Sequence, residues 1–231
     1  MKTIGLLGGM SWESTQTYYR LINEGVKARL GGLHSARLVL FSVDFAEIEA
    51  LQHKGDWPAT AEILSGAALS LQKAGADFLV IGTNTMHKVA SEIEQAVRIP
   101  LLHIADATAT VLAKDGITRV GLLGTRFTME QAFYRNRLEG AGIDVITPDG
   151  AQRDEVHRVI YEELCQGQIN SDSRDAYLDI VASLSGRGAQ AVILGCTEIG
   201  LLIRHADTEV PLYDTTEIHA AQAVEQALNH P

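Results

Sequence analysis

An internal duplication constrains the fold of this chain more than any other feature. The segment GADFLVIGTNT at residues 75–85 aligns without a gap with GAQAVILGCTE at residues 188–198, an offset of 113 residues. A second pair, IGLLG at residues 4–8 and VGLLG at residues 120–124, agrees at an offset of 116 residues. The segments follow one another in the same order in both halves. This repeat predicts two similar α/β lobes related by a pseudo-twofold axis, with loops from both lobes facing one cleft.

Length and composition are compatible with two such lobes. The chain has 231 residues, enough for two lobes of ordinary domain size. Hydrophobic residues make up 46% and charged residues 21%, so a packed core is expected and disorder is not. The net charge is −10, and the Lys and Arg residues form no basic stripe, which argues against a nucleic-acid partner.

Strand-like apolar runs alternate with helical patterns along the whole chain, which is typical of parallel sheets flanked by helices. The predicted strands are Thr3–Leu7, Ala36–Ser42, Phe78–Ile81, Leu101–His103, Arg119–Leu123, Val145–Thr147, Ala191–Leu194 and Leu212–Tyr213. The predicted helices begin at Ser11 or Ser14 and run to about Ala28, and then cover Ala59–Lys73, Tyr177–Leu184 and Thr216–Leu228. We assign residues 1–105 with about 210–231 to the first lobe, and about 106–209 to the second.

Targeting signals are not evident in the sequence. The apolar run from Ile4 to Met10 is shorter than a signal peptide and ends at Trp12-Glu13, and no run is long enough to span a membrane. Cys165 and Cys196 are the only cysteines and form no disulfide framework or C-x-x-C pair. We therefore expect a cytoplasmic protein with no membrane partner.

Thr83 and Cys196 occupy matching positions in the duplicated segments, each after a strand-terminal glycine. Ligands of parallel α/β sheets bind at the carboxyl ends of strands, so both residues fall where chemistry is expected. A thiol at a helix N-terminus has a lowered pKa, which would make Cys196 a usable base or nucleophile. The alternatives are purely structural roles: a buried, inert cysteine for Cys196 and a helix cap for Thr83.

Two glycine-rich loops suit a small anion. Gly8-Gly9 and Gly124-Thr125 follow matching strands, and neither has the spacing of a dinucleotide or P-loop fingerprint. Loop N–H groups beside a helix N-terminus bind a carboxylate as well as a phosphate. The eight histidines form no metal-binding pattern, and the acidic pair Glu162-Glu163 fits a solvated helix face.

The segments GGMSW at residues 8–12, TNTMH at residues 83–87 and GCTE at residues 195–198 resemble those of the aspartate/glutamate racemase family over essentially the whole chain. The similarity is strongest to its bacterial broad-specificity, L-aspartate/glutamate-type members. The resemblance implies two lobes of four-stranded parallel sheet with the site between them. It also implies amino-acid racemisation without pyridoxal phosphate, metal or any other cofactor.

Family members use one cysteine from each lobe, one to remove the α-proton and the other to reprotonate the opposite face. Here Thr83 stands in place of the first cysteine, as in the subgroup just described. The resemblance implies that Cys196 deprotonates the L enantiomer and that Thr83 works poorly from the D side. It assigns substrate binding to Met10, Gln52, Asn84, Thr85, Thr125, Thr197 and Glu198.

The substrate side chain is less well defined by the resemblance. Members specific for acidic substrates place basic residues near the segments that contain Gln52 and Glu162–Cys165 here, and neither segment includes an evident Arg or Lys. Aspartate and glutamate, or a broader set of polar amino acids, are therefore expected. Other readings are a single-cysteine decarboxylase, a maleate-type isomerase or a weakly active amino-acid-binding protein. A homodimer is expected because family members are often dimers.

Overall fold

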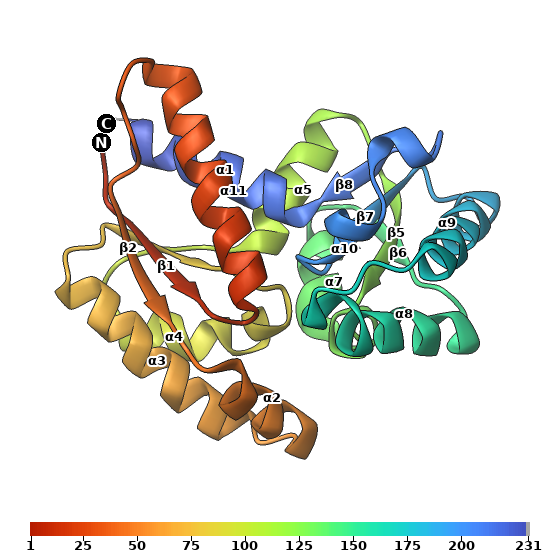
Figure 1. The fold of residues 1–231 in the computed structure, drawn as a ribbon, viewed down its shortest axis with the longest axis horizontal. Helices are drawn as coiled ribbons and strands as arrows, with labels where there is room; N and C mark the ends of the chain where they lie inside the picture. The colour runs from red at the N-terminus through yellow and green to blue at the C-terminus, as the bar shows by residue number, and fades with distance from the viewer. Residues whose placement is uncertain (230–231) are drawn as a thin grey trace. The chain divides into compact units, whose positions relative to one another are not determined.

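The computed structural model describes residues 1–229, which divide into two compact units. One unit comprises Met1–Ile104 and the chain from His219 onward, and the other comprises Ala105–Ile218. The chain enters the second unit at the start of α5 (Ile104–Lys114) and returns within α11 (Thr215–Leu228) (Figure 1).

The first unit contains a four-stranded, all-parallel sheet in the order β2-β1-β3-β4. Its strands are β1 (Ile4–Gly8), β2 (Leu38–Ser42), β3 (Phe78–Ile81) and β4 (Leu101–Leu102). Its helices are α1 (Trp12–Leu30), α2 (Phe45–Lys54), α3 (Trp57–Lys73), the 3₁₀ helix η1 (Thr85–Val89) and α4 (Ala90–Ala96). Helices lie on both faces of this sheet (Figure 1).

Strand periodicity divides the interior of this unit into two cores. Ile4 and Phe78 pack with Tyr18 of α1 on one face of the sheet, where α11 also contributes. Leu7, on the opposite face, packs with Leu64 of α3. Alternate residues of a strand point to opposite faces, so one short apolar strand supplies both cores.

The sequence left Ser11 and Ser14 as alternative starts of α1, and the structure distinguishes them. Ser11 is the N-cap, and its hydroxyl accepts a hydrogen bond from the backbone N–H of Ser14 at 3.3 Å. The Ser14 hydroxyl instead donates to the carbonyl of Gly82 at 2.9 Å, at the end of β3. Ser11 therefore begins the helix, while Ser14 ties it to the strand end that precedes Thr83.

The second unit repeats the first in strand order. Its sheet is again parallel, in the order β6-β5-β7-β8. The strands are β5 (Arg119–Gly124), β6 (Asp144–Ile146), β7 (Ala191–Gly195) and β8 (Leu212–Asp214). The helices are α6 (Arg126–Glu130), α7 (Ala132–Gly140), α8 (Gly150–Glu162), η2 (Leu164–Gln166), α9 (Ser171–Gly186), α10 (Ile199–Leu202) and η3 (His205–Asp207). The predicted α/β fold with two four-stranded parallel sheets is confirmed.

The predicted return to the first lobe near residue 210 differs from the observed pairing. Strand β8 (Leu212–Asp214) pairs with β7, so these residues complete the second sheet. The return occurs after Ile218, within α11. The duplication carried a signal for this pairing, because VPL at residues 210–212 repeats IPL at residues 99–101, which leads into β4 beside β3.

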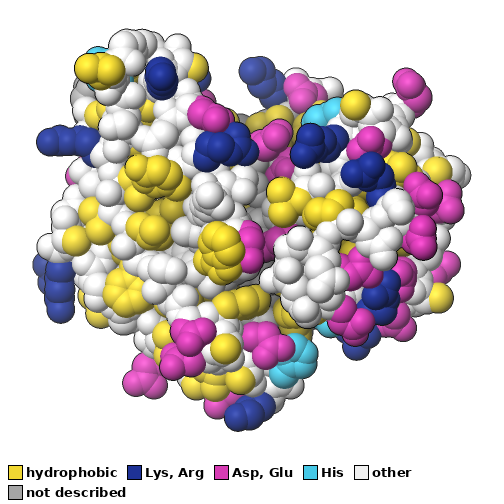
Figure 2. All heavy atoms as spheres, viewed as in Figure 1, with side chains coloured by type: hydrophobic (Ala, Val, Ile, Leu, Met, Phe, Trp, Pro, Cys, Tyr) yellow, Lys and Arg dark blue, Asp and Glu magenta, His cyan; other side chains and the backbone are white. Residues whose placement is uncertain are grey.

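Surface composition shows how charge is distributed. On the face drawn in Figure 2, Lys and Arg side chains are interspersed with Asp and Glu and do not gather into a stripe.

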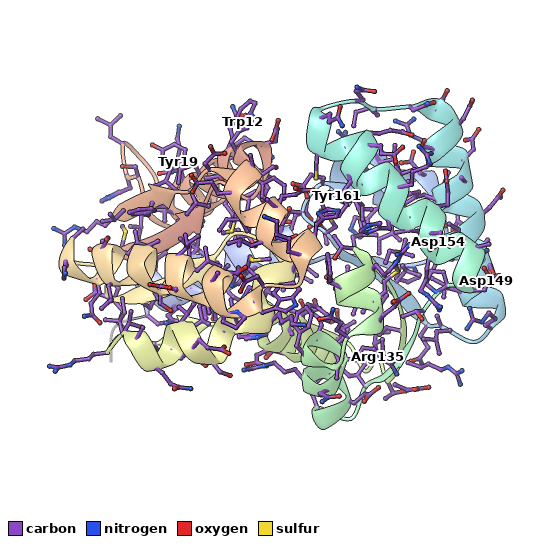
Figure 3. The ribbon with its side chains drawn as sticks, turned by 90° about the horizontal axis from the view of Figure 1, so that it is seen from below. Trp12, Tyr19, Arg135, Asp149, Asp154 and Tyr161 are labelled. Carbon is purple, nitrogen blue, oxygen red and sulfur yellow. The ribbon has the colours of Figure 1, made fainter. Side chains whose placement is uncertain are left out.

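Trp12 and Tyr19, both on α1, are 64% and 55% exposed (Figure 3). Within residues 1–229, no helix has the length and apolarity needed to cross a membrane.

Candidate active-site residues at the strand ends

In each unit the pairing register brings two predicted loops together. The N–H of Gly82 donates to the carbonyl of Leu7 at 2.8 Å, so the Gly8-Gly9 loop and Thr83 leave neighbouring strands at the same edge of the first sheet. Gly124 pairs with Gly195 in the second sheet, so Thr125 and Cys196 leave β5 and β7 side by side. A Cβ on Gly124 would lie 2.8 Å from the carbonyl oxygen of Gly195, which explains the glycine.

The loop after β1 is fixed by its own backbone. Gly9 has φ of 93°, a conformation that favours glycine, and its N–H donates to the Thr15 hydroxyl at 2.7 Å. Met10 follows in the loop and is 3% exposed, packed with Leu7 and Met86 in the core between the sheet and α3. Met10 therefore forms part of the apolar wall under this loop.

Thr83 is held in place through its main chain. Its carbonyl accepts a hydrogen bond from Nδ1 of His87 at 2.8 Å, and Nε2 of His87 accepts one from the N–H of Ile104 at 3.2 Å. A carbonyl only accepts and an amide N–H only donates, so His87 is the neutral tautomer with its proton on Nδ1. Thr83 does not cap a helix: the N-cap of η1 is Asn84, which makes no side-chain cap bond.

Gln52 and Met86 place neutral polar groups beside this loop. Gln52 lies on α2, is 3% exposed, and its Nε2 donates to the thioether sulfur of Met86 at 3.8 Å. Asn84 and Thr85, in the loop itself, are also buried. Lys88, which the sequence analysis did not single out, lies 4.1 Å from the ring centroid of Trp57, and burial lowers its pKa.

Cys196 contacts the carboxylate that follows it two residues later. Its Sγ–H donates to Oε2 of Glu198 at 3.1 Å, and the Thr197 hydroxyl donates to the same oxygen at 2.6 Å. All three residues are buried. The thiol therefore lies in a compact polar group that belongs to one loop.

The expected lowering of the Cys196 pKa is wrong. Burial of the thiol, then the negative charge of Glu198 and the nearby Cys165, raise its pKa well above the ordinary value. The helix that follows, α10, has only four residues and starts at Ile199, so it contributes little dipole at the sulfur. At rest near neutral pH, Cys196 is a thiol and not a thiolate.

Thr125 caps a helix at the end of β5. Its Oγ1 accepts a hydrogen bond from the N–H of Thr128 at 3.3 Å and lies 3.3 Å from the Thr128 hydroxyl. The loop N–H groups predicted to bind an anion are thus organised by α6, a helix of five residues.

The acidic segment is partly a structural cluster. Glu162 is exposed as expected, but Glu163 is only 9% exposed and accepts hydrogen bonds from Arg158 at 3.0 Å and Ser173 at 2.7 Å. Arg158 also forms a two-bond pair with Glu155, which lowers the pKa of that carboxylate. A guanidinium thus does lie beside this segment, and carboxylates already neutralise its charge.

Aromatic residues of α8 flank the same region. The His157 ring lies 4.8 Å from that of Tyr161, which is marked on α8 in Figure 3, and 6.4 Å from that of Phe127. Across the described residues, no three His, Cys, Asp or Glu side chains come together in a way that could hold a metal ion.

Two parallel α/β units with the same strand order, each with polar loops at its strand ends, define a duplicated α/β protein. The chain belongs to the Asp/Glu/Hydantoin racemase family, whose model matches residues 7–223. It is therefore an isomerase of the racemase type, as the resemblance implied.

Individual relatives agree with this assignment. The broad-specificity amino-acid racemase RacX of Bacillus subtilis is 26% identical over 226 residues, which cover 96% of each chain. Among solved structures, a Yersinia pestis protein assigned as an Asp/Glu racemase is 60% identical in sequence. Its structure matches with a TM-score of 0.93 over 99% of this chain and 100% of that one. An aspartate racemase homologue from Pyrococcus horikoshii is 34% identical, with a TM-score of 0.86 over 99% and 100% of the two chains.

Proposed function

We propose that this protein is a cofactor-independent amino-acid racemase, in which Cys196 and Thr83 serve opposite faces of one α-carbon. The observation that carries the proposal is the duplication itself: matching strand ends of two like sheets bear a thiol in one unit and a hydroxyl in the other. The names of relatives, a broad-specificity amino-acid racemase and an aspartate racemase homologue, support the substrate class.

The proposed reaction has two proton transfers. On the L side, Cys196 reacts as the thiolate formed by loss of its proton: the Cα–H bond breaks, an S–H bond forms at its sulfur, and the electron pair stays on carbon. The Thr83 O–H bond then breaks, a Cα–H bond forms on the opposite face of the carbanion, and Thr83 regains a proton from water. Hydrogen bonds from the Thr85 and Thr125 hydroxyls and from loop N–H groups, with that of Thr197 among them, to the substrate carboxylate stabilise the charge that develops.

Substrate binding is proposed to extend from these loops. Asn84 joins the three threonines around the polar end of the amino acid, while Met10 and Gln52 lie toward its side chain. The Gln52 amide carries no charge, and Arg158 is engaged by Glu155 and Glu163. A strict requirement for an acidic side chain is therefore not expected, and aspartate, glutamate and neutral polar amino acids such as homoserine are the proposed substrates.

The test is α-proton exchange in heavy water, followed by NMR, for L- and D-amino acids presented separately. Exchange of aspartate, glutamate or homoserine, unaffected by chelator and without added pyridoxal phosphate, is the expected result, and the Cys196→Ala variant is the control. Exchange that requires a metal or pyridoxal phosphate would contradict the proposal. Loss of CO₂ from a malonate, or conversion of maleate to fumarate, with no amino-acid exchange would support the decarboxylase or isomerase alternative.

We further propose that two copies of the chain associate. The exposed aromatic side chains of Trp12 and Tyr19 on α1 supply apolar surface of the kind found in such contacts. Light scattering should give twice the chain mass of 25.0 kDa, and a Trp12→Glu variant at the chain mass would identify α1 as the contact. A wild-type protein at the chain mass would contradict association.

A further inference from the structure

Glu198 is buried and directed toward Cys196. It occupies the N-cap position of α10 but makes no side-chain cap bond to that helix, and only 3% of its surface is exposed. Its Oε2 instead accepts hydrogen bonds from the Cys196 thiol at 3.1 Å and from the Thr197 hydroxyl at 2.6 Å. This oxygen therefore contacts the reactive thiol of its own loop and the hydroxyl that lies between them in sequence.

The protonation state of Cys196 creates a chemical requirement. Burial and the adjacent carboxylate raise the thiol pKa, so the sulfur carries its proton at rest. A protonated sulfur cannot accept an α-proton, and its own proton must first leave. Loss of that proton to solvent would place a thiolate beside the Glu198 carboxylate, and two buried like charges at this distance are unfavourable.

We propose that Glu198 accepts the Cys196 proton during turnover, which makes it the proton partner of the thiol and not a ligand of the substrate. This inference rests on the proposed racemase function. The S–H bond breaks, an O–H bond forms on the Glu198 carboxylate, and the electron pair stays on sulfur. The pair holds one proton and one negative charge both before and after the step, so no charge is created in the buried loop.

The α-proton transfer then follows at the sulfur. The Cα–H bond breaks, the S–H bond re-forms, and the electron pair stays on carbon. Glu198 then releases its proton to water, which restores the resting pair. Thr197 positions the acceptor, because its hydroxyl donates to the same carboxylate oxygen that faces the sulfur. The GCTE sequence at residues 195–198 thus supplies the base, the group that orients the acceptor and the acceptor itself.

The decisive variant is Glu198→Gln, which keeps the size of the side chain and removes its ability to take a proton. We expect exchange from the L enantiomer at about pH 7 to fall by about 10²-fold, the usual contribution of a general base. Between about pH 7 and 9 the variant rate should rise about tenfold per pH unit, because its thiol must ionise to solvent. The wild-type rate should be nearly constant over that range.

Two further variants separate proton transfer from simple packing. Glu198→Asp keeps a carboxylate and should retain the flat pH profile at a reduced rate. Glu209→Gln makes the same charge change at an exposed position of the same unit and should leave rate and profile unchanged. A Glu198→Gln enzyme with a lower rate but a flat profile would show a purely structural role and overturn the inference.

Alkylation of the thiol tests the pair without any substrate. In a Cys165→Ser background, so that only Cys196 reacts, iodoacetamide should modify the Glu198→Gln protein faster than its parent at about pH 8, since removal of the carboxylate lowers the thiol pKa. Identical alkylation profiles would overturn the pairing. A wild-type protein that exchanges no amino acid while the alkylation shift persists would instead overturn the proposed function, and the two failures are thereby distinguished.

Discussion

The loops after β3 and β7 occupy the same place in two sheets of the same strand order, but they hold their reactive groups in different ways. Thr83 is fixed through its carbonyl, which accepts a hydrogen bond from a neutral imidazole, His87. Cys196 is fixed through its side chain, which donates to the Glu198 carboxylate. In the duplicated segments the position of Glu198 corresponds to Thr85. Only the second loop, therefore, pairs its reactive atom with a proton acceptor.

The same contrast extends to the groups behind the loops. In the first unit, buried His219 donates from Nε2 to the carbonyl of Leu102 at 2.9 Å and accepts from the Tyr18 hydroxyl at 2.8 Å. In the second unit, the half-buried Asp214 at the end of β8 accepts from the N–H of Thr216 at 2.7 Å and lies against Gly200 of α10. The ionisable group behind the loops is thus a neutral imidazole, His219, in the first unit and a carboxylate, Asp214, in the second.

The largest expected effect comes from removing the reactive thiol of the second loop. Cys196→Ala should reduce α-proton exchange from the L enantiomer by about 10³-fold or more, because no other thiol or carboxylate is proposed to contact the α-carbon from that side. Loss of one small buried atom should change the free energy of unfolding by only about 1 kcal/mol. Deuterium incorporation and chemical denaturation measure the two quantities.

Cys165→Ala is the matched control for that substitution. It removes the only other thiol, which is half-buried and packs against the same core as Cys196. Its exchange rate should stay within about twofold of the wild type. Near-normal exchange by the Cys196→Ala protein would exclude Cys196 as the base, and a comparable loss in both variants would point to packing.

A second prediction concerns low pH, which should lower the stability of the first unit and raise that of the second. Burial lowers the pKa of His219 to about 4, so the unfolded chain takes up a proton below about pH 6.5 that the folded chain refuses. Between about pH 7 and 5 this should remove about 2 kcal/mol of stability from the first unit. Burial raises the pKa of Asp214 to about 6, so its folded form gains a proton first, which should add about 1 kcal/mol to the second unit.

Hydrogen exchange of peptides from β3 and β7, corrected for the intrinsic pH dependence, reads the two units separately. Acid should decrease protection in β3 and increase it in β7. His219→Gln should remove the first trend and Asp214→Asn the second, while each leaves the other in place. Parallel changes in both strands would contradict an independent electrostatic response. The carboxylate of Glu155, whose pKa the Arg158 guanidinium lowers, titrates below this pH range and does not interfere.

Much of this architecture was predictable because it depends on short-range patterns. The strands end at Gly8, Ile81, Gly124 and Gly195, within one residue of the predicted ends, since apolar runs bounded by glycine and turn residues are local signals. The assignment of β8 to the first lobe was wrong although the repeat of IPL (99–101) as VPL (210–212) places it beside β7, as β4 lies beside β3. The burial of Glu163 was missed because it depends on contacts outside its own segment: Ser173, one of its partners, lies on α9.

The candidate residues show the same division. Sequence matching identified the Thr83 and Cys196 positions, because a duplicated backbone repeats its strand ends. It did not give the protonation state of Cys196, which depends on how deeply the thiol is buried and on which way the Glu198 side chain turns. A helix dipole was a reasonable expectation from GCTE, but α10 is too short to provide one. The burial of Cys196 and the orientation of the Glu198 carboxylate are known only from the structure.

The smallest expected effect sharpens the comparison by giving the first loop a thiol. Thr83→Cys should raise exchange from the D enantiomer roughly tenfold near pH 8, because a thiol is a far better base than a neutral hydroxyl. The gain is limited because Thr85, and not a glutamate, stands two residues later, so the new thiol must ionise to solvent. Exchange from the D side should therefore climb with pH, while exchange from the L side stays flat. Thr83→Ser, which keeps the hydroxyl, is the control and should show no gain. A Thr83→Cys protein with a flat D-side profile would mean that the first loop has a proton acceptor of its own, and one with no gain at any pH would show that Thr83 does not reach the α-carbon.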